Sequence, residues 1–181
     1  MRIFFIIFLF FISCNQPHIE EKKIKTETVF IKDTVTYTYE SYINKYKRLA
    51  QLQKEKYGIP ASIIMAQAIL ESTYGNSDLV KNANNHFGIK CNTNWDGVGY
   101  YKDAEKRDEC YRVYNTPEES FNDHSIFLKR ERYNELFKIK ITEYKKWALG
   151  LKKYGYATNP DYAELLIDLI ERYQLYNLDK K

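Results

Sequence analysis

The sequence lacks several features that would assign it to a common functional class. It has no glycine-rich phosphate loop, no cluster of metal-ligating residues and no stripe of basic residues. The apolar run in residues 1–13 is shorter than the roughly 20 residues that a membrane-spanning helix needs. The 28 basic and 24 acidic residues are interspersed, which argues against nucleic acid. We therefore expect no cofactor, no metal ion and no nucleic-acid partner.

The amino-terminal segment has the composition of an export signal. Arg2 precedes the apolar run, and the small residue Ser13 comes directly before Cys14, an order typical of exported precursors. The letters FISC at the end of this segment resemble the lipobox of bacterial lipoproteins, with Phe11 in place of the usual Leu. We expect a signal peptide at residues 1–13, a lipidated Cys14, and a membrane-anchored protein in the cell envelope, on the periplasmic face or at the outer membrane. The alternative, an uncleaved anchor helix, also leaves the rest of the chain outside the cytoplasm.

Cysteine is scarce, and the other two cysteines form an even pair in an oxidising compartment. Cys91 and Cys110 flank a stretch with strand-like patches, and a disulfide between them would close a loop of about 20 residues, worth roughly 3 kcal/mol. The rival interpretation is a metal site. It lacks the nearby CxxC or HxxxH spacing that zinc ligands usually show.

The rest of the chain divides into a tether and a single domain. Residues 15–40 are polar and lysine-rich and are expected to form the tether, whereas residues 41–178 are expected to form a mainly α domain with a small β hairpin at about 95–114. Hydrophobic periodicity and capping residues predict the helices. The first begins after Ser41 and ends at Gly58, and the second runs from Pro60 to about Ser72 with Gly75 as the cap. Residues 76–85 are expected to form a short helix and an asparagine-rich loop, a further helix begins at the capping box of Thr116 and Glu119, and the last two span 141–155 and 159–176, the latter with Asn159 as cap and Pro160 as first residue.

The stretch "IPASIIMAQAILESTYGNS" places a carboxylate at the end of an apolar helix. Gln67 and Glu71 share one face of this helix, and apolar residues cover most of the remaining circumference, which predicts a buried helix. Partial desolvation of Glu71 would raise its pKa and prepare it to donate a proton, as glycoside hydrolysis requires. The alternative is a Glu71 that turns outward to meet solvent or a lysine.

Several separated motifs carry a resemblance to a known family. "AILESTYGNS", "ANNHFGIKC", "YRVY", "EESFNDHSIFL" and "YGYATNPDYAELL" occur in this order over about residues 45–175. They resemble the signature of glycoside hydrolase family 73, the peptidoglycan N-acetylglucosaminidases, with Thr73 and Tyr74 in place of a small residue and Trp. The resemblance implies a lysozyme-like α+β fold with a small β-hairpin lobe and Glu71 as the general acid. It implies cleavage of the β-1,4 bond after N-acetylglucosamine in peptidoglycan.

A second catalytic group is less clearly marked. Related proteins often carry a Glu in the β lobe, which aligns with Tyr100 here. Asp103 and Glu105 lie on one face of the expected strand, and we assign them as candidates, with solvated hairpin charges as the alternative. The 2-acetamido group of the substrate can also attack the anomeric carbon itself, in which case no second carboxylate is needed.

Five residues are candidates for substrate binding. Asn84 and Asn85 are suited either to bind acetamido groups or to form a turn before Gly88. Phe87 belongs to the same motif. Trp95 either stacks on sugar or pins the hairpin, and Tyr156 either lines the groove or is a buried aromatic residue. His124, between Asp123 and Ser125, is expected to be a packed or surface histidine, because consecutive helix positions cannot form a catalytic triad.

These features predict a lipid-anchored peptidoglycan hydrolase. Two other enzymatic activities remain as alternatives, cleavage after N-acetylmuramic acid by a muramidase and cleavage by a lytic transglycosylase. A non-catalytic module that binds or assembles the wall is the alternative outside enzymes, and the absence of the β-lobe Glu is the feature that supports it.

Overall fold

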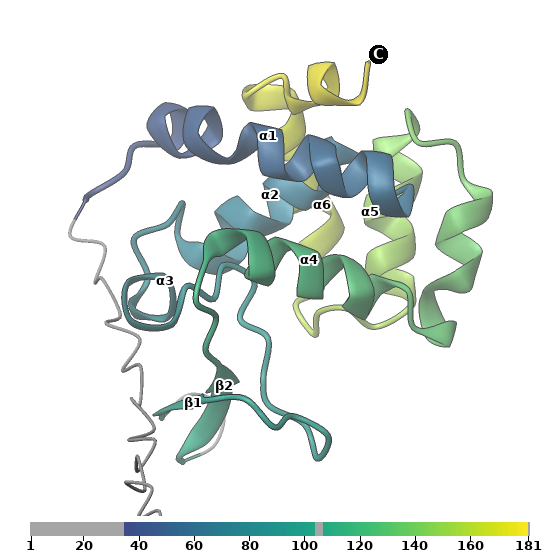
Figure 1. Ribbon diagram of the computed structural model, residues 1–181. Coiled ribbons are helices and arrows are strands. Elements are labelled where there is room, and N and C mark those ends of the chain that lie inside the picture. Colours follow the sequence, from purple (N-terminus) through teal and green to yellow (C-terminus); the bar gives the residue numbers. More distant parts are fainter. Residues whose placement is uncertain (1–34, 104–106, 181) are drawn as a thin grey trace, which may run out of the picture.

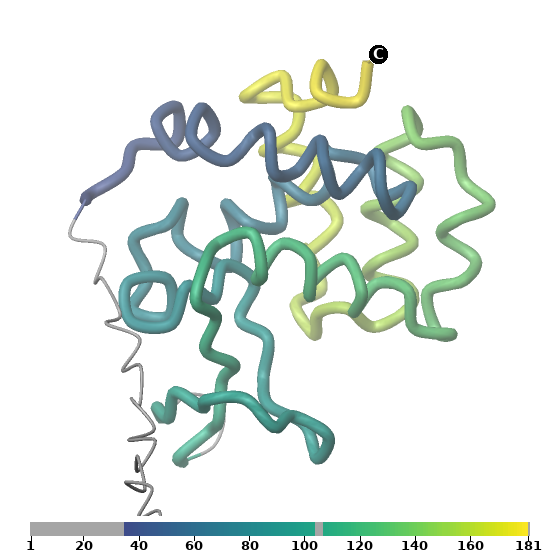
Figure 2. The backbone as a smooth tube through the Cα atoms, viewed as in Figure 1, coloured from purple at the N-terminus to yellow at the C-terminus, as the bar shows by residue number. Residues whose placement is uncertain are grey.

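Helices form the body of the molecule, and a small two-stranded lobe projects from it (Figures 1 and 2). The computed structural model describes residues 35–103 and 107–180. Its elements are, in order, α1 (Tyr39–Tyr57), α2 (Ala61–Ser72), α3 (Asp78–Ala83), β1 (Gly99–Lys102), β2 (Glu109–Arg112), α4 (Pro117–Leu128), the 3-10 helix η1 (Glu131–Lys138), α5 (Tyr144–Lys153), α6 (Tyr162–Arg172) and the 3-10 helix η2 (Leu175–Asp179). The predicted mainly α fold with a β-hairpin lobe is confirmed.

The expected signal peptide, the lipidated Cys14 and residues 15–34 of the expected tether lie outside the described ranges. Within those ranges, none of the helices combines the length and hydrophobicity that crossing a bilayer requires. The end of the expected tether packs on the domain: Tyr37 is buried, and its backbone N–H donates to the Asn76 side chain over 2.9 Å. Helix α1 then begins at Tyr39, before the expected start at Ser41.

Helix α2 runs through the centre of the core. All its residues except Leu70 and Glu71 are buried, as expected for a helix that is apolar on every side. It packs against α1, α5, α6 and η2, and large buried side chains such as Trp147 and Phe121 complete the core around it. The helix therefore holds its last turn, which carries Glu71, in a rigid position.

The β lobe is a short antiparallel hairpin with a cross-link at its base. Gly99 pairs with Arg112 and Lys102 with Glu109. Cys91 and Cys110 form the predicted disulfide, with their Cα atoms 5.3 Å apart, and the Cys91 N–H also donates to the carbonyl of Cys110 over 2.8 Å. The segment before the hairpin is thus fastened to β2 by both a covalent bond and a hydrogen bond.

Several helix ends differ from the sequence-based predictions. Helix α2 is capped by Thr73, and Gly75 lies in the turn beyond it. Thr116 caps α4, but the Glu119 carboxylate accepts from the backbone of Asn115, so the reciprocal half of the predicted capping box is wrong.

The last helix is also shorter than predicted at both ends. Helix α6 begins at Tyr162 because the Asn159 side chain accepts from the Asp161 backbone N–H, over 2.9 Å, and forms a local turn instead of a cap. It ends at Arg172 because Gln174 adopts a left-handed conformation, with φ at 52°, which breaks the helix before η2.

The amino-terminal end of α2 is capped from the other end of the domain. Pro60, at the N-cap position, makes no side-chain capping bond, and Ser62 is fully buried. The Asp179 carboxylate accepts from the Ser62 backbone N–H over 3.0 Å and from its hydroxyl over 2.5 Å. Since buried helix N–H groups have no water to bond, Asp179 satisfies groups that would otherwise be unpaired.

We expect Asp179→Ala to lower the free energy of unfolding by about 2 kcal/mol, because it removes a buried charged cap. Urea unfolding followed by circular dichroism measures this change. Asp168→Ala is the matched control: Asp168 is more than half exposed and forms a surface ion pair with Arg172, so its loss is expected to cost under about 1 kcal/mol. Equal effects of the two substitutions would show that the cap is not important for stability.

Candidate active site

Glu71 lies in the last turn of α2, where the chain reverses sharply. Thr73, Tyr74 and Gly75 all have positive φ angles, of 51°, 41° and 84°. A Cβ atom on Gly75 would lie 2.6 Å from the ring of Tyr42, so only glycine fits there. This turn ends the helix directly after Glu71 and leaves its carboxyl group at the rim of the core.

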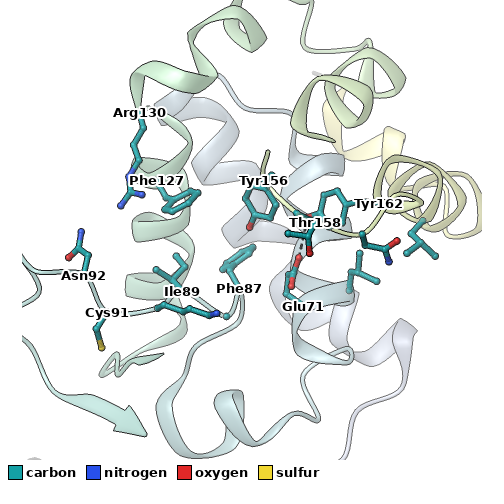
Figure 3. A pocket seen from close by; sticks show the side chains of 16 residues that line it. Glu71, Phe87, Ile89, Cys91, Asn92, Phe127, Arg130, Tyr156, Thr158 and Tyr162 are labelled. Atoms are coloured by element: carbon teal, nitrogen blue, oxygen red, sulfur yellow. Dashed lines mark hydrogen bonds between the residues drawn. The ribbon is translucent and has the colours of Figure 1, made fainter. Parts of the chain in front are cut away.

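The Glu71 side chain faces a cavity of about 660 Å³ between the helical body and the base of the β lobe (Figure 3). The cavity is large enough for a small-molecule or sugar ligand. Figure 3 shows Glu71 and Tyr162 on one side of it and Phe127 and Arg130 on the other. Its lining comprises Leu70, Glu71, Phe87, Gly88, Ile89, Lys90, Cys91, Asn92, Phe127, Arg130, Tyr156, Ala157, Thr158, Asn159, Tyr162 and Leu165.

Burial controls the ionisation of Glu71. Desolvation raises the pKa of its carboxyl group to about 7, against an ordinary value of 4.5, and the hydrogen bond from Tyr162 partly opposes this rise. In the described ranges, no lysine or arginine forms an ion pair with Glu71. The outward-facing glutamate paired with a lysine, considered from the sequence, is therefore not what the structure shows. At neutral pH a substantial fraction of the carboxyl groups carries a proton.

Tyr162 connects two residues on one face of α2. Its hydroxyl donates to Oε1 of Glu71 over 3.2 Å and accepts from Nε2 of Gln67 over 3.0 Å. The prediction that Gln67 and Glu71 share one helix face is thus confirmed by their common partner. Tyr162 lies in the segment "NPDYAELL", but its residue type alone does not indicate a contact with Glu71.

Aromatic rings form the floor and wall of the cavity. Phe87 and Tyr156 both line it, which agrees with the groove-lining alternative for Tyr156. Phe87 stacks on His124, with ring centroids 3.9 Å apart, and Tyr156 stacks on Tyr162 at 5.5 Å. His124 is fully buried, and burial lowers its pKa to about 3, so this histidine is neutral and packed.

Asn84 and Asn85 bond to the backbone and do not line the cavity. The Asn84 amide donates to the carbonyls of Tyr114 and Asn115, over 3.1 and 3.0 Å. The Asn85 side chain is buried, accepts from the N–H of Ile89, and donates to the carbonyls of Ile89 and Arg112. These bonds support the turn-forming alternative for both residues, which join the β lobe to the helical body.

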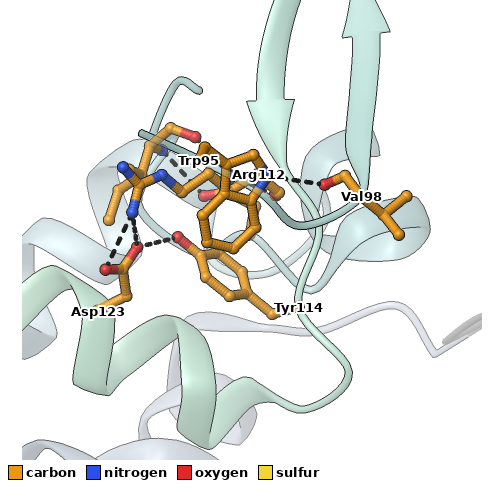
Figure 4. Close-up of polar contacts among 7 residues, drawn as sticks. Trp95, Val98, Arg112, Tyr114 and Asp123 are labelled. Atoms are coloured by element: carbon orange, nitrogen blue, oxygen red, sulfur yellow. Dashed lines mark hydrogen bonds and ion pairs between the residues drawn. The ribbon is translucent and has the colours of Figure 1, made fainter. Parts of the chain in front are cut away.

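Trp95 clamps the hairpin (Figure 4). Its Nε1–H donates to the carbonyl of Val98 over 3.1 Å, and the Arg112 guanidinium lies 4.6 Å from the centroid of its ring. Arg112 in turn forms an ion pair with Asp123 of α4 at 2.9 Å, and the Tyr114 hydroxyl donates to the same carboxylate over 2.6 Å. The pinning role considered from the sequence agrees with this arrangement, which fixes the lobe to α4.

The structure does not bring Asp103 to the cavity. This residue follows β1, is exposed, and accepts a hydrogen bond from the backbone of Asp108 over 3.0 Å. Glu105 lies outside the described residues. Among the described residues that line the cavity, Glu71 is the only carboxylic acid.

Comparison with known proteins agrees with this geometry. The glucosaminidase family model, described as mannosyl-glycoprotein endo-beta-N-acetylglucosaminidase, matches residues 47–175. The chain is 36% identical over 149 residues to exo-glucosaminidase LytG of Bacillus subtilis, which covers 77% of this chain and 53% of LytG. It is 32% identical over 136 residues to peptidoglycan hydrolase FlgJ of Salmonella typhimurium, which covers 68% of this chain and 42% of FlgJ.

Solved structures show the same fold. The glycoside hydrolase domain of Salmonella typhimurium FlgJ matches with a TM-score of 0.65 and 27% identity, over 78% of this chain and 91% of that domain. The chain spans about half the length of the curated relatives it matches. Because the family model covers most of the chain and includes the helix, the cavity and the hairpin described above, the protein belongs to the glucosaminidase family.

Proposed function

We propose that the protein hydrolyses the β-1,4 glycosidic bond after N-acetylglucosamine in peptidoglycan, with Glu71 as the general acid. The observation that carries the proposal is a buried carboxyl group, with its pKa near 7, on the wall of a cavity of about 660 Å³. Glycosidases need such a protonated acid beside the leaving oxygen. Membership of the glucosaminidase family supports the sugar specificity.

The reaction begins with a proton transfer to the glycosidic oxygen. Tyr162 donates to Oε1 of Glu71, which leaves Oε2 to carry the proton toward the substrate. As the proton moves to the leaving oxygen, the bond between C1 and that oxygen breaks and its electron pair stays with the oxygen. Glu71 becomes a carboxylate, stabilised by the Tyr162 hydroxyl, and then takes a proton from the water that adds to C1.

A second group must meet the positive charge that develops at C1. The carbonyl oxygen of the substrate's 2-acetamido group is one candidate, and it is supported by the absence of a second carboxylate among the described residues that line the cavity. Asp103 does not line the cavity, so Glu105, which lies outside the described residues, is the remaining candidate from the protein. Phe87 and Tyr156 provide apolar faces against which a sugar ring can pack.

We also propose that the protein works outside the cytoplasm, held in the cell envelope by lipid on Cys14. The lipobox-like letters FISC support the anchor, and the disulfide between Cys91 and Cys110 fits an oxidising compartment. One relative, FlgJ, is itself named a peptidoglycan hydrolase. Peptidoglycan is therefore the proposed partner, and the membrane is the proposed attachment site.

Digestion of purified sacculi, followed by borohydride reduction and mass spectrometry of the products, tests the proposed bond specificity. We expect reduced N-acetylglucosamine at the new chain ends. Reduced N-acetylmuramic acid would identify a muramidase, and 1,6-anhydro ends would identify a lytic transglycosylase. Release of long internal fragments would indicate endo cleavage, in contrast to the exo cleavage that the name of LytG describes. Binding without any new ends would show a non-catalytic wall-binding module.

A further inference from the structure

The cavity has an unbalanced positive charge on the side away from Glu71. Arg130 follows the carboxyl-terminal end of α4 and lines the cavity, and Figure 3 shows it beside Phe127, across the cavity from Glu71. The side chain of Arg130 is exposed. Within residues 35–103 and 107–180, no carboxylate forms an ion pair with its guanidinium group.

The guanidinium group of Arg130 stacks on an aromatic ring and can still bind a ligand. It lies 4.1 Å from the centroid of the Phe127 ring, and stacking of this kind restricts the side chain while leaving its planar edge free to donate. Lys90, which also lines the cavity, already donates to Glu109 over 2.8 Å. Arg130 is therefore the cation of this wall that is available to a carboxylate, which a guanidinium binds with two parallel hydrogen bonds.

The chemistry of the proposed substrate provides such a carboxylate. The sugar rings and acetamido groups of peptidoglycan are uncharged, and the lactyl group of each muramoyl residue is joined to a peptide stem by an amide bond. The carboxylates of the polymer are therefore on the stems. A glycan bound across Glu71 places a muramoyl residue next to the sugar that is cut, so that its stem leaves the cavity at one side.

We propose that Arg130 binds a carboxylate of this peptide stem and makes the enzyme prefer glycan strands whose stems are charged. The proposal rests on the proposed function and adds a specificity-determining residue to it. Arg130 contacts the stem and takes no part in bond cleavage. Its effect should therefore depend on the charge of the stem.

The test compares two substrates that differ only in stem charge. Both are sacculi with acetylated amines, and in one of them carbodiimide and glycinamide have converted the stem carboxylates to neutral amides. We expect the parent protein to act on the charged substrate with a kcat/KM about fivefold to tenfold higher than on the neutral one. Arg130→Gln should lose this preference, so that its kcat/KM is about the same on the charged and the neutral substrate. Raising the salt concentration should reduce the preference of the parent.

Arg132→Gln is the matched control, because Arg132 is also exposed and lies over an aromatic ring, that of Tyr133, but does not line the cavity. It should retain the full preference. Arg130→Lys should retain part of it, as a single point charge. Equal activity of the parent on both substrates, or an equal loss on both for Arg130→Gln, overturns the stem contact. A parent protein that releases no fragments from either substrate instead refutes the proposed function.

Discussion

Replacing Glu71 by glutamine is expected to lower the rate of peptidoglycan hydrolysis by about a thousandfold, the usual contribution of a positioned general acid. The amide keeps the shape of the side chain and can still accept the hydrogen bond from Tyr162, but it has no acidic proton to give to the leaving oxygen. The measurement is the release of soluble fragments from purified sacculi under conditions where the parent protein is linear in time.

Controls must show that Glu71→Gln loses activity because it lacks the acidic proton, and not because it fails to fold or to bind the wall. Sedimentation with sacculi should show that Glu71→Gln still binds the wall, since the aromatic lining and Arg130 are unchanged, and its circular dichroism spectrum should match that of the parent. Glu164→Gln is the matched control, because Glu164 is an exposed residue of α6, two positions from Tyr162. It should hydrolyse walls at the parental rate. Parental activity of Glu71→Gln would show that another group donates the proton.

The pH dependence of the reaction gives the second large effect. A general acid works only while protonated, and the pKa of Glu71 is about 7. Half of the Glu71 carboxyl groups are protonated at pH 7 and about one in a hundred at pH 9, so kcat/KM should fall about fiftyfold between these two pH values. A glutamate with an ordinary pKa of 4.5 would place the same decline in the acid range. Initial rates on sacculi in buffers of constant ionic strength measure the pH at which kcat/KM declines.

Tyr162→Phe tests whether the fall of kcat/KM at alkaline pH, the alkaline limb of the pH profile, reflects the ionisation of Glu71. The Tyr162 hydroxyl stabilises the charged form and lowers the pKa of Glu71. Removing it should raise that pKa and move the alkaline limb to higher pH. The pH of half-maximal kcat/KM should rise, even if the maximal rate falls. An unchanged limb in Tyr162→Phe, or a parental rate that stays level up to pH 9, would contradict the assignment.

The fold was largely predictable from the sequence because its signals are local. Gly58 ends α1 in a left-handed conformation, and the all-apolar pattern of α2 predicts its central position. The predicted helix boundaries were wrong where one side chain had two possible hydrogen-bond partners. Asn159 bonds to Asp161 and forms a turn instead of capping α6, and Glu119 bonds to Asn115 instead of Thr116. These choices depend on geometry that residue type does not determine.

The candidate site was predictable only in part, because several of its contacts join residues that are far apart in the sequence. The burial of Glu71 follows from its own helix, and its raised pKa was expected. Tyr162 is 91 positions away in the chain, and Asp179 caps α2 across 117 positions. Such contacts depend on how helices pack, which no local pattern encodes. The amide of Asn85 suits a sugar or the backbone equally well in the sequence, and the structure shows it bonded to backbone.

The disulfide between Cys91 and Cys110 has a consequence for when the enzyme becomes able to cut. Cys91 is itself part of the cavity wall, and its disulfide bond to Cys110 fastens this part of the wall to β2. A newly synthesised chain in a reducing cytosol would lack this cross-link and would have a looser substrate channel. Oxidation of the two cysteines would then act as a maturation step, and a thiol reductant added to the finished enzyme should slow it without altering Glu71.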